Sequence, residues 1–413
     1  MKSVKNLTLI FALLCSNASF AENISDAEFD ALRKRTQKLE QELNQLKKQI
    51  ASGKHRQAKK KQHKYDDLPK ISAYFAFDKT FYSNDSGNRP HNSELRFGRI
   101  TLKHTIKHEH MPDLKVKVGA DFARGDATIY DAFITLPVNA SNQISLGHMR
   151  EPFSLNLLSS RVNDLFVDRP AAVKMSPARN IGIRYDHIKK NYYASIGAFG
   201  DGVDDQQDAD ETFSYGARFV FNPDLFDKIK THLGYAYRSS NPTGDSVSYV
   251  ASEADIAAGE NDLETGNIND VNTIRQDGIE LAFVNPRFSM SSEYFITELS
   301  RDNASKIELY GTYVQFRVGL NKKLLNYNQQ KRTIDLAKDS YNVFELGYRY
   351  SYVDFNHGDL RSGNYESHSF GLNYIYSHNL RFLSSYINIE TDENSVYGKN
   401  SPEIVAFRAQ FLF

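Results

Sequence analysis

The sequence of 413 residues contains one cysteine, Cys15, and no tryptophan. Cys15 lies in an N-terminal segment with the features of an export signal, so we expect the exported chain to carry no thiol. This excludes a disulfide framework, a thiolate metal site and a cysteine nucleophile. Acidic and basic side chains number 51 each, so no net charge favours binding to nucleic acid.

Long apolar runs are also absent. Beyond the N-terminal segment, no stretch is apolar for the roughly 18 residues that a membrane-spanning helix needs, and the mean hydropathy is −0.54. Yet the chain has 24 Tyr and 27 Phe. Many aromatic residues in a polar chain are typical of an outer-membrane β-barrel, whose strands face lipid on one side and water on the other. Without tryptophan, Tyr and Phe must form the interfacial girdles.

The N-terminus has a basic start, an apolar core from Leu7 to Leu14, and a small-x-small sequence that ends at Ala21. This pattern predicts a signal peptide over residues 1–21. A membrane anchor is the alternative, but the core is far shorter than the roughly 20 residues that cross a bilayer. A lipoprotein signal at Cys15 is disfavoured by the bulky Leu14 before it. Cleavage after Ala21 would remove Cys15.

Residues 22–53 carry apolar side chains at alternating steps of three and four, with charged residues between them. Three heptads of this spacing predict a short coiled coil that joins copies of the chain. A single amphipathic helix lying on the barrel is the alternative. The predicted seam consists of Phe29, Leu32, Thr36, Leu39, Leu43, Leu46 and Ile50.

Residues 54–69 form a basic linker. The stretch from Lys54 to Lys64 has six Lys or Arg, two His and no acid. One interpretation is a solvated connection between the coiled coil and the barrel. The other is attachment to something anionic in the periplasm, such as the cell wall or lipid headgroups.

From residue 70 onward the apolar period changes to two, in segments of about ten residues, which is the length of a tilted membrane strand. Sixteen segments predict an all-β fold over residues 70–413: a 16-stranded antiparallel transmembrane β-barrel preceded by the coiled-coil helix. Such a barrel leaves an aqueous channel. The predicted strands lie near 71–82, 93–107, 114–124, 127–138, 143–150, 179–189, 191–200, 212–222, 229–239, 277–285, 288–299, 307–320, 342–355, 365–377, 380–391 and 403–413. In the last strand, one face carries Val405, Phe407, Ala409, Phe411 and Phe413, and the other carries Arg408 and Gln410.

The loop after the fifth predicted strand, residues 151–177, is too apolar for a solvated outer loop. We expect it to fold into the lumen, where its charged side chains would select the passing ions. The alternative is that the basic side chains pair with the acids of the same loop and hold it in place. Some bases can act on ions while others pair with acids. The bases are Arg150, Arg161, Arg169, Lys174 and Arg179, and the acids are Glu151, Asp164 and Asp168.

Several stretches between residues 93 and 413 resemble, in order, the phosphate-selective porin O and P family. They include GHMREPFSLNLLSSRVNDLFVDRP, SPARNIGIR, GAFGDG, FELGYRYSYVDFN, GLNYIYSHNLRF and FRAQFLF. The resemblance implies a non-enzymatic porin in the outer membrane of a Gram-negative bacterium, in contact with lipopolysaccharide. It also implies a homotrimer without cofactors, through which small solutes diffuse, in some members anions such as phosphate.

The resemblance also implies site residues. Arg161 follows two serines where phosphate-selective relatives carry a base, and Arg169 matches an arginine of their inward loop. Arg96 and Arg99 fit an Arg-rich second strand, which Phe97 and Gly98 interrupt. Lys338 matches a lysine in a periplasmic segment that folds back into the pore, here residues 321–340. Asn328 stands where a second pore lysine is expected.

Two outer loops depart from the anion-selective pattern. Residues 240–276 have seven acids and one base, and residues 201–211 have six acids and no base. A negative entrance repels anions over a Debye length, about 8 Å at physiological salt. Acidic loops also bind divalent cations and could bridge neighbouring lipopolysaccharide. The ion preference therefore stays open.

Two other function classes compete with a porin. An outer-membrane barrel enzyme, such as a protease or phospholipase, needs a nucleophile and a base, but the histidines are scattered without partners at suitable spacing. A closed structural or adhesive barrel would conduct nothing. His104, His108 and His110 could share one strand face as a metal cluster, but a solvated turn beside Pro112 explains them as well, so we predict no metal site.

Overall fold

The structure is a computed structural model that describes residues 68–413 except 124, 204–211, 243–245 and 254–260, and six scattered positions nearer the N-terminus. The chain divides into two units, residues 1–68 and 69–413. Apart from the six positions, the predicted signal peptide, coiled coil and linker up to residue 67 lie outside the described residues. No helix among the described residues combines the length and the apolar character that crossing a bilayer requires.

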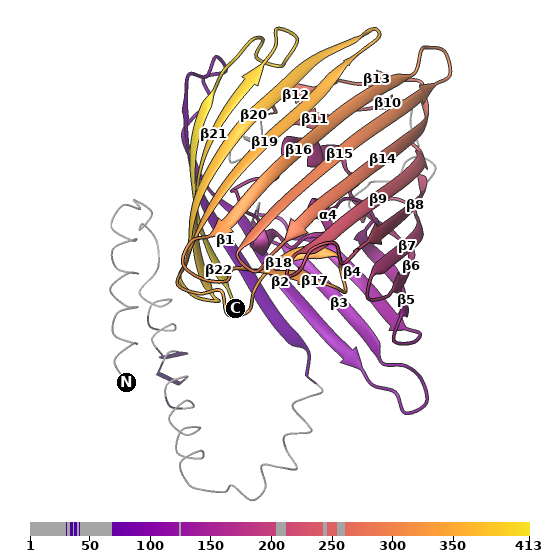
Figure 1. Cartoon of the computed structure of the whole chain (residues 1–413), viewed down its shortest axis with the longest axis vertical. Helices are drawn as coiled ribbons and strands as arrows, with labels where there is room; N and C mark the ends of the chain where they lie inside the picture. Colours follow the sequence, from indigo (N-terminus) through magenta and orange to yellow (C-terminus); the bar gives the residue numbers. More distant parts are fainter. Residues whose placement is uncertain are drawn as a thin grey trace, which may run out of the picture. The chain divides into compact units, whose positions relative to one another are not determined.

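Within the described residues, sixteen strands form one closed antiparallel barrel (Figure 1). Each strand pairs with the next, and β22 (Glu403–Leu412) pairs with β1 (Lys70–Ser83) to close the sheet. The other barrel strands are β2 (Asn92–Ile106), β3 (Leu114–Asp121), β4 (Thr128–Pro137), β5 (Asn142–Arg150), β6 (Arg179–Ile188), β7 (Tyr192–Phe199), β8 (Phe213–Phe221), β9 (Lys230–Asn241), β14 (Val271–Val284), β15 (Phe288–Arg301), β16 (Ile307–Gly319), β19 (Val343–His357), β20 (Leu360–Ile375) and β21 (Leu380–Thr391). The predicted antiparallel 16-stranded barrel is confirmed.

Alternation along β22 shows why these sequences form a barrel wall. Val405 and Phe407 are exposed on the outer face, while Ala406 and Arg408 are buried on the inner face. The backbone of the last residue, Phe413, exchanges two hydrogen bonds with that of Ala73 in β1, at 3.0 and 3.1 Å. Closure leaves no edge strand, so backbone groups are satisfied on a surface that faces lipid.

The two largest differences from the predicted strand limits are at outer ends. β14 begins at Val271 rather than near residue 277, and β20 begins at Leu360 rather than near residue 365. The added residues, 271–276 and 360–364, are mostly polar, and the alternation of apolar and polar residues is lost there. The tight turn between β19 and β20 is made possible by Gly358, whose φ is 61°.

The barrel has a terminal end, at which β1 begins and β22 ends, and an opposite end. Most connections at the terminal end are short turns. One is longer and contains a small hairpin of β17 (Leu325–Asn328) and β18 (Thr333–Leu336). At the opposite end, the described residues between 242 and 270, which we call the upper insert, include four two-residue strands, β10 (Ser246–Val247), β11 (Val250–Ala251), β12 (Leu263–Glu264) and β13 (Ile268–Asn269).

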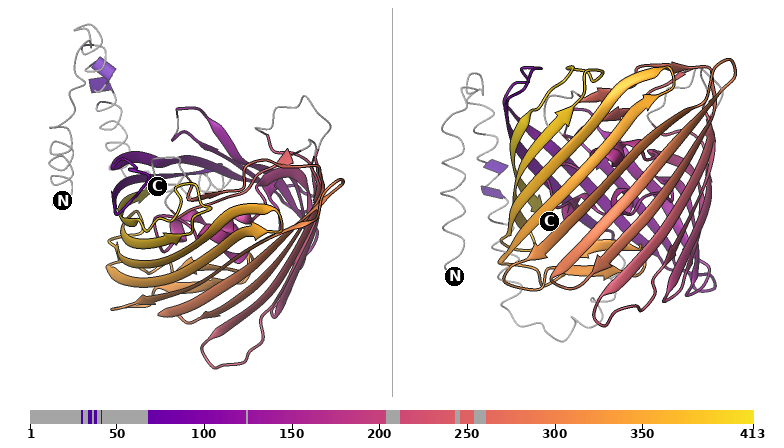
Figure 2. Two further views of the ribbon diagram at one scale, coloured as in Figure 1. Left: turned by 90° about the horizontal axis from the view of Figure 1, so that it is seen from above. Right: turned by 45° about the horizontal axis from the view of Figure 1, so that its top comes forward.

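The connection between β5 and β6, residues 151–178, is called the inner loop here. It contains the short helices α4 (Leu155–Leu158), η1 (Arg161–Asn163) and η2 (Ala171–Met175). Both views in Figure 2 show it inside the ring of strands. Phe153, Phe166 and Ala171 are at most 2% exposed. The prediction that this loop folds into the lumen and packs on the wall is confirmed.

Candidate functional site: the lumen and its basic cluster

The inner loop packs against glycines on the inner face of the wall. A Cβ atom added to Gly347 would lie 2.7 Å from Leu165, which is closer than real Cβ contacts allow. The glycines and the loop side chains that meet them are Gly278 with Phe153, Gly311 with Met175 and Ala172, Gly347 with Leu165, and Gly371 with Phe166. These strands lack side chains where the loop must approach. Sequence and packing therefore fix the place of the loop.

A buried glutamate anchors the start of the loop. Glu293 of β15 accepts hydrogen bonds from the backbone N–H groups of Leu155 at 2.8 Å and Asn156 at 2.9 Å. Its carboxylate also accepts from Ser154 Oγ at 3.2 Å and from the hydroxyl of Tyr313 at 2.6 Å. The otherwise unsatisfied N–H groups at the start of α4 are thus paired with the wall.

The upper insert also enters the lumen. Glu253 is fully buried and accepts hydrogen bonds from Ala171 N of the inner loop at 3.1 Å and from Ser369 Oγ of β20 at 3.0 Å. It forms an ion pair with Arg349 of β19 at 2.5 Å. One carboxylate therefore joins the upper insert, the inner loop and the wall.

The β17–β18 hairpin reaches across the lumen at the terminal end. Arg332, at its tip, donates to the backbone oxygen of Tyr192 at 3.0 Å and to Asn222 Oδ1 at 2.6 Å, both on the β6 to β9 side. The hydroxyl of Tyr327 is 2.7 Å from Nδ1 of the buried His232. Residues 321–340 thus fold back into the barrel, as the family resemblance implies.

Three arginines of the wall, on β8, β21 and β22, are buried and paired with acids. The guanidiniums of Arg218, Arg381 and Arg408 are at most 2% exposed. Their ion pairs are Arg218 with Glu280 at 2.7 Å, Arg381 with Glu345 at 2.5 Å and Arg408 with Asp78 at 2.7 Å. A buried pair contributes little net charge to the lumen.

The side of the lumen formed by β2, β3, β6 and the inner loop carries bases that remain partly exposed. The side chains of Arg99 on β2, Arg161 in the inner loop and Arg179 on β6 are 18%, 22% and 22% exposed. Lys117 on β3 is 32% exposed. We call this side the channel face.

Nine bases gather on or behind the channel face, against five acids, so the cluster is positive. The bases are Arg96, Arg99, Lys103, Lys117, Arg150, Arg161, Arg169, Lys174 and Arg179, and the acids are Glu94, Asp121, Asp131, Asp164 and Asp168. Asp131 lies between Lys117 at 2.5 Å and Arg179 at 3.0 Å. We call the fourteen residues the basic cluster.

Two β-bulges shape the channel face. In the pairing of β1 with β2, Arg96 is an extra residue without a partner position on β1. In the pairing of β3 with β4, Tyr130 is the extra residue. A bulge re-aims the side chains next to it. The ring of Tyr130 lies 4.9 Å from the guanidinium carbon of Arg99 and 5.4 Å from that of Arg179. Both bulges therefore place a side chain among the cations.

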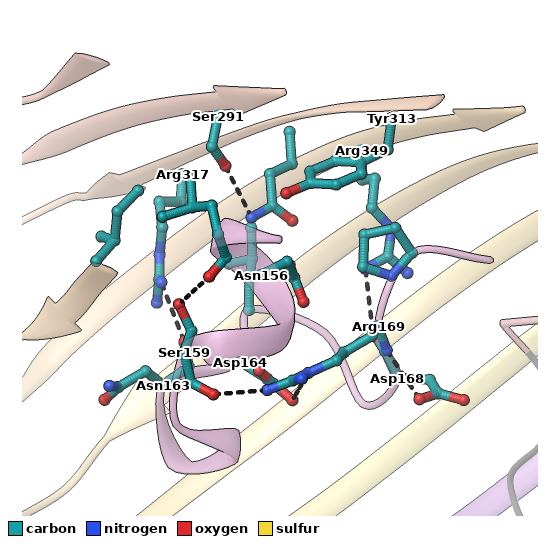
Figure 3. A pocket seen from close by; sticks show the side chains of 15 residues that line it. Asn156, Ser159, Asn163, Asp164, Asp168, Arg169, Ser291, Tyr313, Arg317 and Arg349 are labelled. Atoms are coloured by element: carbon teal, nitrogen blue, oxygen red, sulfur yellow. Dashed lines mark hydrogen bonds and ion pairs between the residues drawn. The ribbon is translucent and has the colours of Figure 1, made fainter. Parts of the chain in front are cut away.

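Arg169 lies behind the inner loop rather than on the channel face. Figure 3 shows its guanidinium directed at Ser159 and Asp164. It donates to the backbone oxygens of Leu157 at 3.0 Å and Ser159 at 2.8 Å, and it is 5% exposed. Burial lowers its pKa to about 10, in spite of the neighbouring Asp164. Arg169 therefore stays charged at neutral pH and ties the loop together.

A small cavity of about 30 Å³ separates the loop from the wall at this point (Figure 3). Arg317 and Arg349 border it from β16 and β19, and they donate to the backbone oxygens of Asn163 at 3.1 Å and Asp168 at 3.0 Å. Burial raises the pKa of the Asp168 carboxyl, but nearby bases, led by Arg96, outweigh this and lower it below its usual range. The loop is thus held by charged hydrogen bonds from both sides.

The remaining predicted site residues are distributed as follows. Arg150 is partly buried and donates to the backbone oxygen of Ser159 at 3.2 Å. Arg96 lies 3.7 Å from Glu94 and 3.9 Å from Asp168. Lys174 interacts electrostatically with Asp168 and Asp262. Lys338 is exposed in the turn after β18. Their roles in the pore stay predictions.

The sequence analysis missed Lys103 and Lys117. Both interact electrostatically with Lys331 at the tip of the β17–β18 hairpin. A signal was present, because Lys103 shares a strand face with Arg99, and Lys117 alternates with the outward Val118. The histidines near Pro112 form no such group: in the described part of the chain, no three His, Cys, Asp or Glu side chains are placed to hold a metal.

Comparison with known proteins supports the interpretation of the fold. The family model of the phosphate-selective porin O and P family matches residues 70–413. The chain belongs to this family. As a porin, it forms a channel in the outer membrane. Among curated proteins, none matches this porin in sequence.

Solved porin structures share the fold at low sequence identity. A loop-deletion mutant of OmpT, an outer membrane protein of Vibrio cholerae, superposes with a TM-score of 0.58 at 11% identity, over 84% of this chain and 99% of that chain. An anion-selective porin from Comamonas acidovorans superposes with a TM-score of 0.56 at 12% identity, over 84% of this chain and 99% of that chain. OprB of Pseudomonas putida superposes with a TM-score of 0.59 at 9% identity, over 86% of this chain and 96% of that chain.

Proposed function

We propose that this porin is a water-filled channel for passive diffusion of small solutes with a preference for anions, phosphate among them. The partly exposed Arg99, Arg161, Arg179 and Lys117 of the channel face carry this proposal. Arg218, Arg381 and Arg408 are buried and paired, so the field along the open side is set by the basic cluster. A lumen lined by bases lowers the barrier for anions. The comparison structure from Comamonas acidovorans is described as anion-selective.

Reversal potentials of the purified porin in planar bilayers, in a tenfold gradient of potassium chloride, test this proposal. We expect an anion preference, and we expect added phosphate to reduce the chloride current because both anions occupy the same cations. A cation preference would mean that the acidic outer loops dominate. The absence of conductance steps would favour a closed barrel, and hydrolysis of lipid or peptide by the pure protein would favour an enzyme.

We further propose that the porin is a homotrimer with its terminal end in the periplasm. The predicted coiled coil of residues 22–53 supports association, and OmpT of Vibrio cholerae is described in a trimer form. In this arrangement the basic linker contacts the cell wall and the acidic outer loops contact lipopolysaccharide through divalent cations. Native electrophoresis tests the trimer: Leu39→Asp in the predicted seam should shift the porin to smaller species, and an unchanged pattern would remove the coiled coil from the assembly.

A further inference from the structure

Phe97 lies at the centre of the basic cluster. It is on the inner face of β2, beside the bulge at Arg96, and it is 6% exposed. A phenylalanine is unexpected among cations that line a water-filled lumen, since its side chain offers a passing anion neither a charge nor a hydrogen-bond donor. In the sequence it only interrupts an Arg-rich strand.

Four guanidiniums surround the ring. The distances from guanidinium carbon to ring centroid are 4.3 Å for Arg99, 5.4 Å for Arg408, 5.5 Å for Arg161 and 5.7 Å for Arg96. A cation within about 6 Å of a ring centroid is attracted when it lies over the ring face. The four arginines come from β2, the inner loop and β22, so one ring collects cations from three separate parts of the chain.

The ring itself is held in place. Tyr74 of β1 stacks on it at 5.7 Å with an interplanar angle of 26°, and Ala76 belongs to the same buried group. The hydroxyl of Tyr74 donates to Gln410 at 3.3 Å. Val162 of the inner loop packs against this group. A fixed ring can fix what stacks on it, because arginine is weakly hydrated and loses little on stacking.

Like charges repel, and acids alone do not explain why these arginines converge. Arg408 is held by Asp78, and Arg99 is 2.7 Å from Asp121. Arg161 lies 3.3 Å from Asp164 and 3.4 Å from Asp168. Asp168 also lies 3.9 Å from Arg96 and so joins Arg96 with Arg161. Asp78, Asp121 and Asp168, however, lie on β1, β3 and the inner loop, and they would draw the other guanidiniums apart. The ring is the contact that all four cations share.

We propose that Phe97 is a positioning residue of the channel: its ring holds Arg96, Arg99 and Arg161 together at the channel face and thereby sets the ion preference of the pore. This inference rests on the proposed function. Without the ring, each guanidinium follows its own acid, and the positive charge at the channel face becomes weaker and more diffuse.

Three substitutions at this position test the inference. Phe97→Leu and Phe97→Met remove the ring, and Met keeps more of the side-chain length. Phe97→Tyr keeps the ring. We expect both aliphatic variants to lower the anion-to-cation permeability ratio about threefold, the scale of one cation–π contact, and Phe97→Tyr to keep the wild-type ratio. Phe355→Leu is the matched control, because Phe355 is a buried wall residue in an apolar cluster.

The wild-type reversal potential tests the proposed function, whereas the difference between variant and wild type tests this inference, so the two can fail separately. Heat-modifiable migration on gels checks that each variant is folded. The inference would be overturned if all three Phe97 variants had the same anion-to-cation permeability ratio. It would also be overturned if Phe355→Leu shifted this ratio as much as the aliphatic Phe97 variants do. A third contrary result would be that Phe97→Tyr is the one variant of the three that assembles, because the ring would then be needed for folding rather than for selectivity.

Discussion

Arginine side chains serve two purposes in this porin, and exposure separates them. Arg218, Arg381 and Arg408 are buried, each with a carboxylate in contact. Arg161 and Arg179 keep about a fifth of their side chains exposed. Because a buried ion pair is costly to break and an exposed one is screened by water, we expect the first group to act on folding and the second on ions.

Arg161 and Arg169 provide a direct comparison at this scale. Arg161→Gln should lower the anion-to-cation permeability ratio with little change in stability, since the side chain is 22% exposed. Arg169→Gln should cost about 3 kcal/mol of stability, because Asp164 would lose a buried partner. Bilayer reversal potentials and thermal unfolding in detergent measure the two effects. If Arg169→Gln shifted selectivity as strongly as Arg161→Gln at unchanged stability, Arg169 would have to face the channel.

At the scale of elements, the position of the inner loop depends on glycines of the wall, which have no side chains, and on carboxylates of the lumen, which accept hydrogen bonds. Gly311, Gly347 and Gly371 leave room for its apolar side chains. Glu293 and Glu253 accept hydrogen bonds from its backbone. Apolar packing gives the loop its position, and the carboxylates satisfy backbone groups that would otherwise be unpaired away from water.

Gly347→Leu should displace the inner loop. Its side chain would occupy the space of Leu165, whose carbon atoms lie 2.7 to 2.8 Å from an added Cβ. Overpacking of this kind costs about 1–3 kcal/mol, which the loop can relieve by moving while the barrel stays closed. We expect a larger and noisier single-channel conductance.

Leu346→Met is the control for this experiment, because Leu346 is the neighbouring residue on the outer face and is 41% exposed. It should leave the conductance as in the wild type. An unchanged conductance in Gly347→Leu, with the barrel folded, would show that the inner loop does not set the width of the pore.

At the scale of the whole molecule, distant segments are tied together at the opposite end of the barrel. Arg89, in the connection after β1, lies 2.9 Å from Asp85 and 2.9 Å from Asp262 of the upper insert. Asn400, before β22, donates to Asp85 at 2.9 Å. We call these four residues the clasp. It links three connections that are far apart in the sequence.

The clasp predicts a pH dependence of stability. Burial raises the pKa of Asp85, but hydrogen bonds from Arg89 and Asn400 outweigh this and lower it to about 2. A depressed pKa means that the stabilisation is complete above about pH 4 and is lost as the pH falls through about 2. Asp85→Asn should therefore cost about 1–2 kcal/mol at pH 7, and the difference from wild type should shrink between pH 4 and pH 2.

Thermal unfolding of wild type and Asp85→Asn in detergent at pH 7, 4 and 2.5 measures this effect. Asp126→Asn, in an exposed loop, serves as the control. A difference between wild type and Asp85→Asn that persists undiminished at pH 2.5 would show that Asp85 does not act through its charge.

Part of the site could be predicted from sequence. Arg96, Arg99, Arg161 and Arg179 gather in one cluster because the apolar inner loop carries Arg161 to the strands that carry the others. Lys117 was missed, and Phe97 counted only as an interruption. In a barrel, a period of two shows which face a side chain takes, but not which side chains stand beside it.

The sequence by itself determined the number of strands, their alternating faces, the closing strand and the inward course of the loop, because each follows from local periodicity and apolar content. Only the tertiary structure decided which arginines are neutralised. Glu345 meets Arg317 and Arg381 from either side of its strand, and Arg408 meets Asp78 across the barrel closure. Those partners are separated by 28 to 330 residues, and only closure of the sheet brings them together.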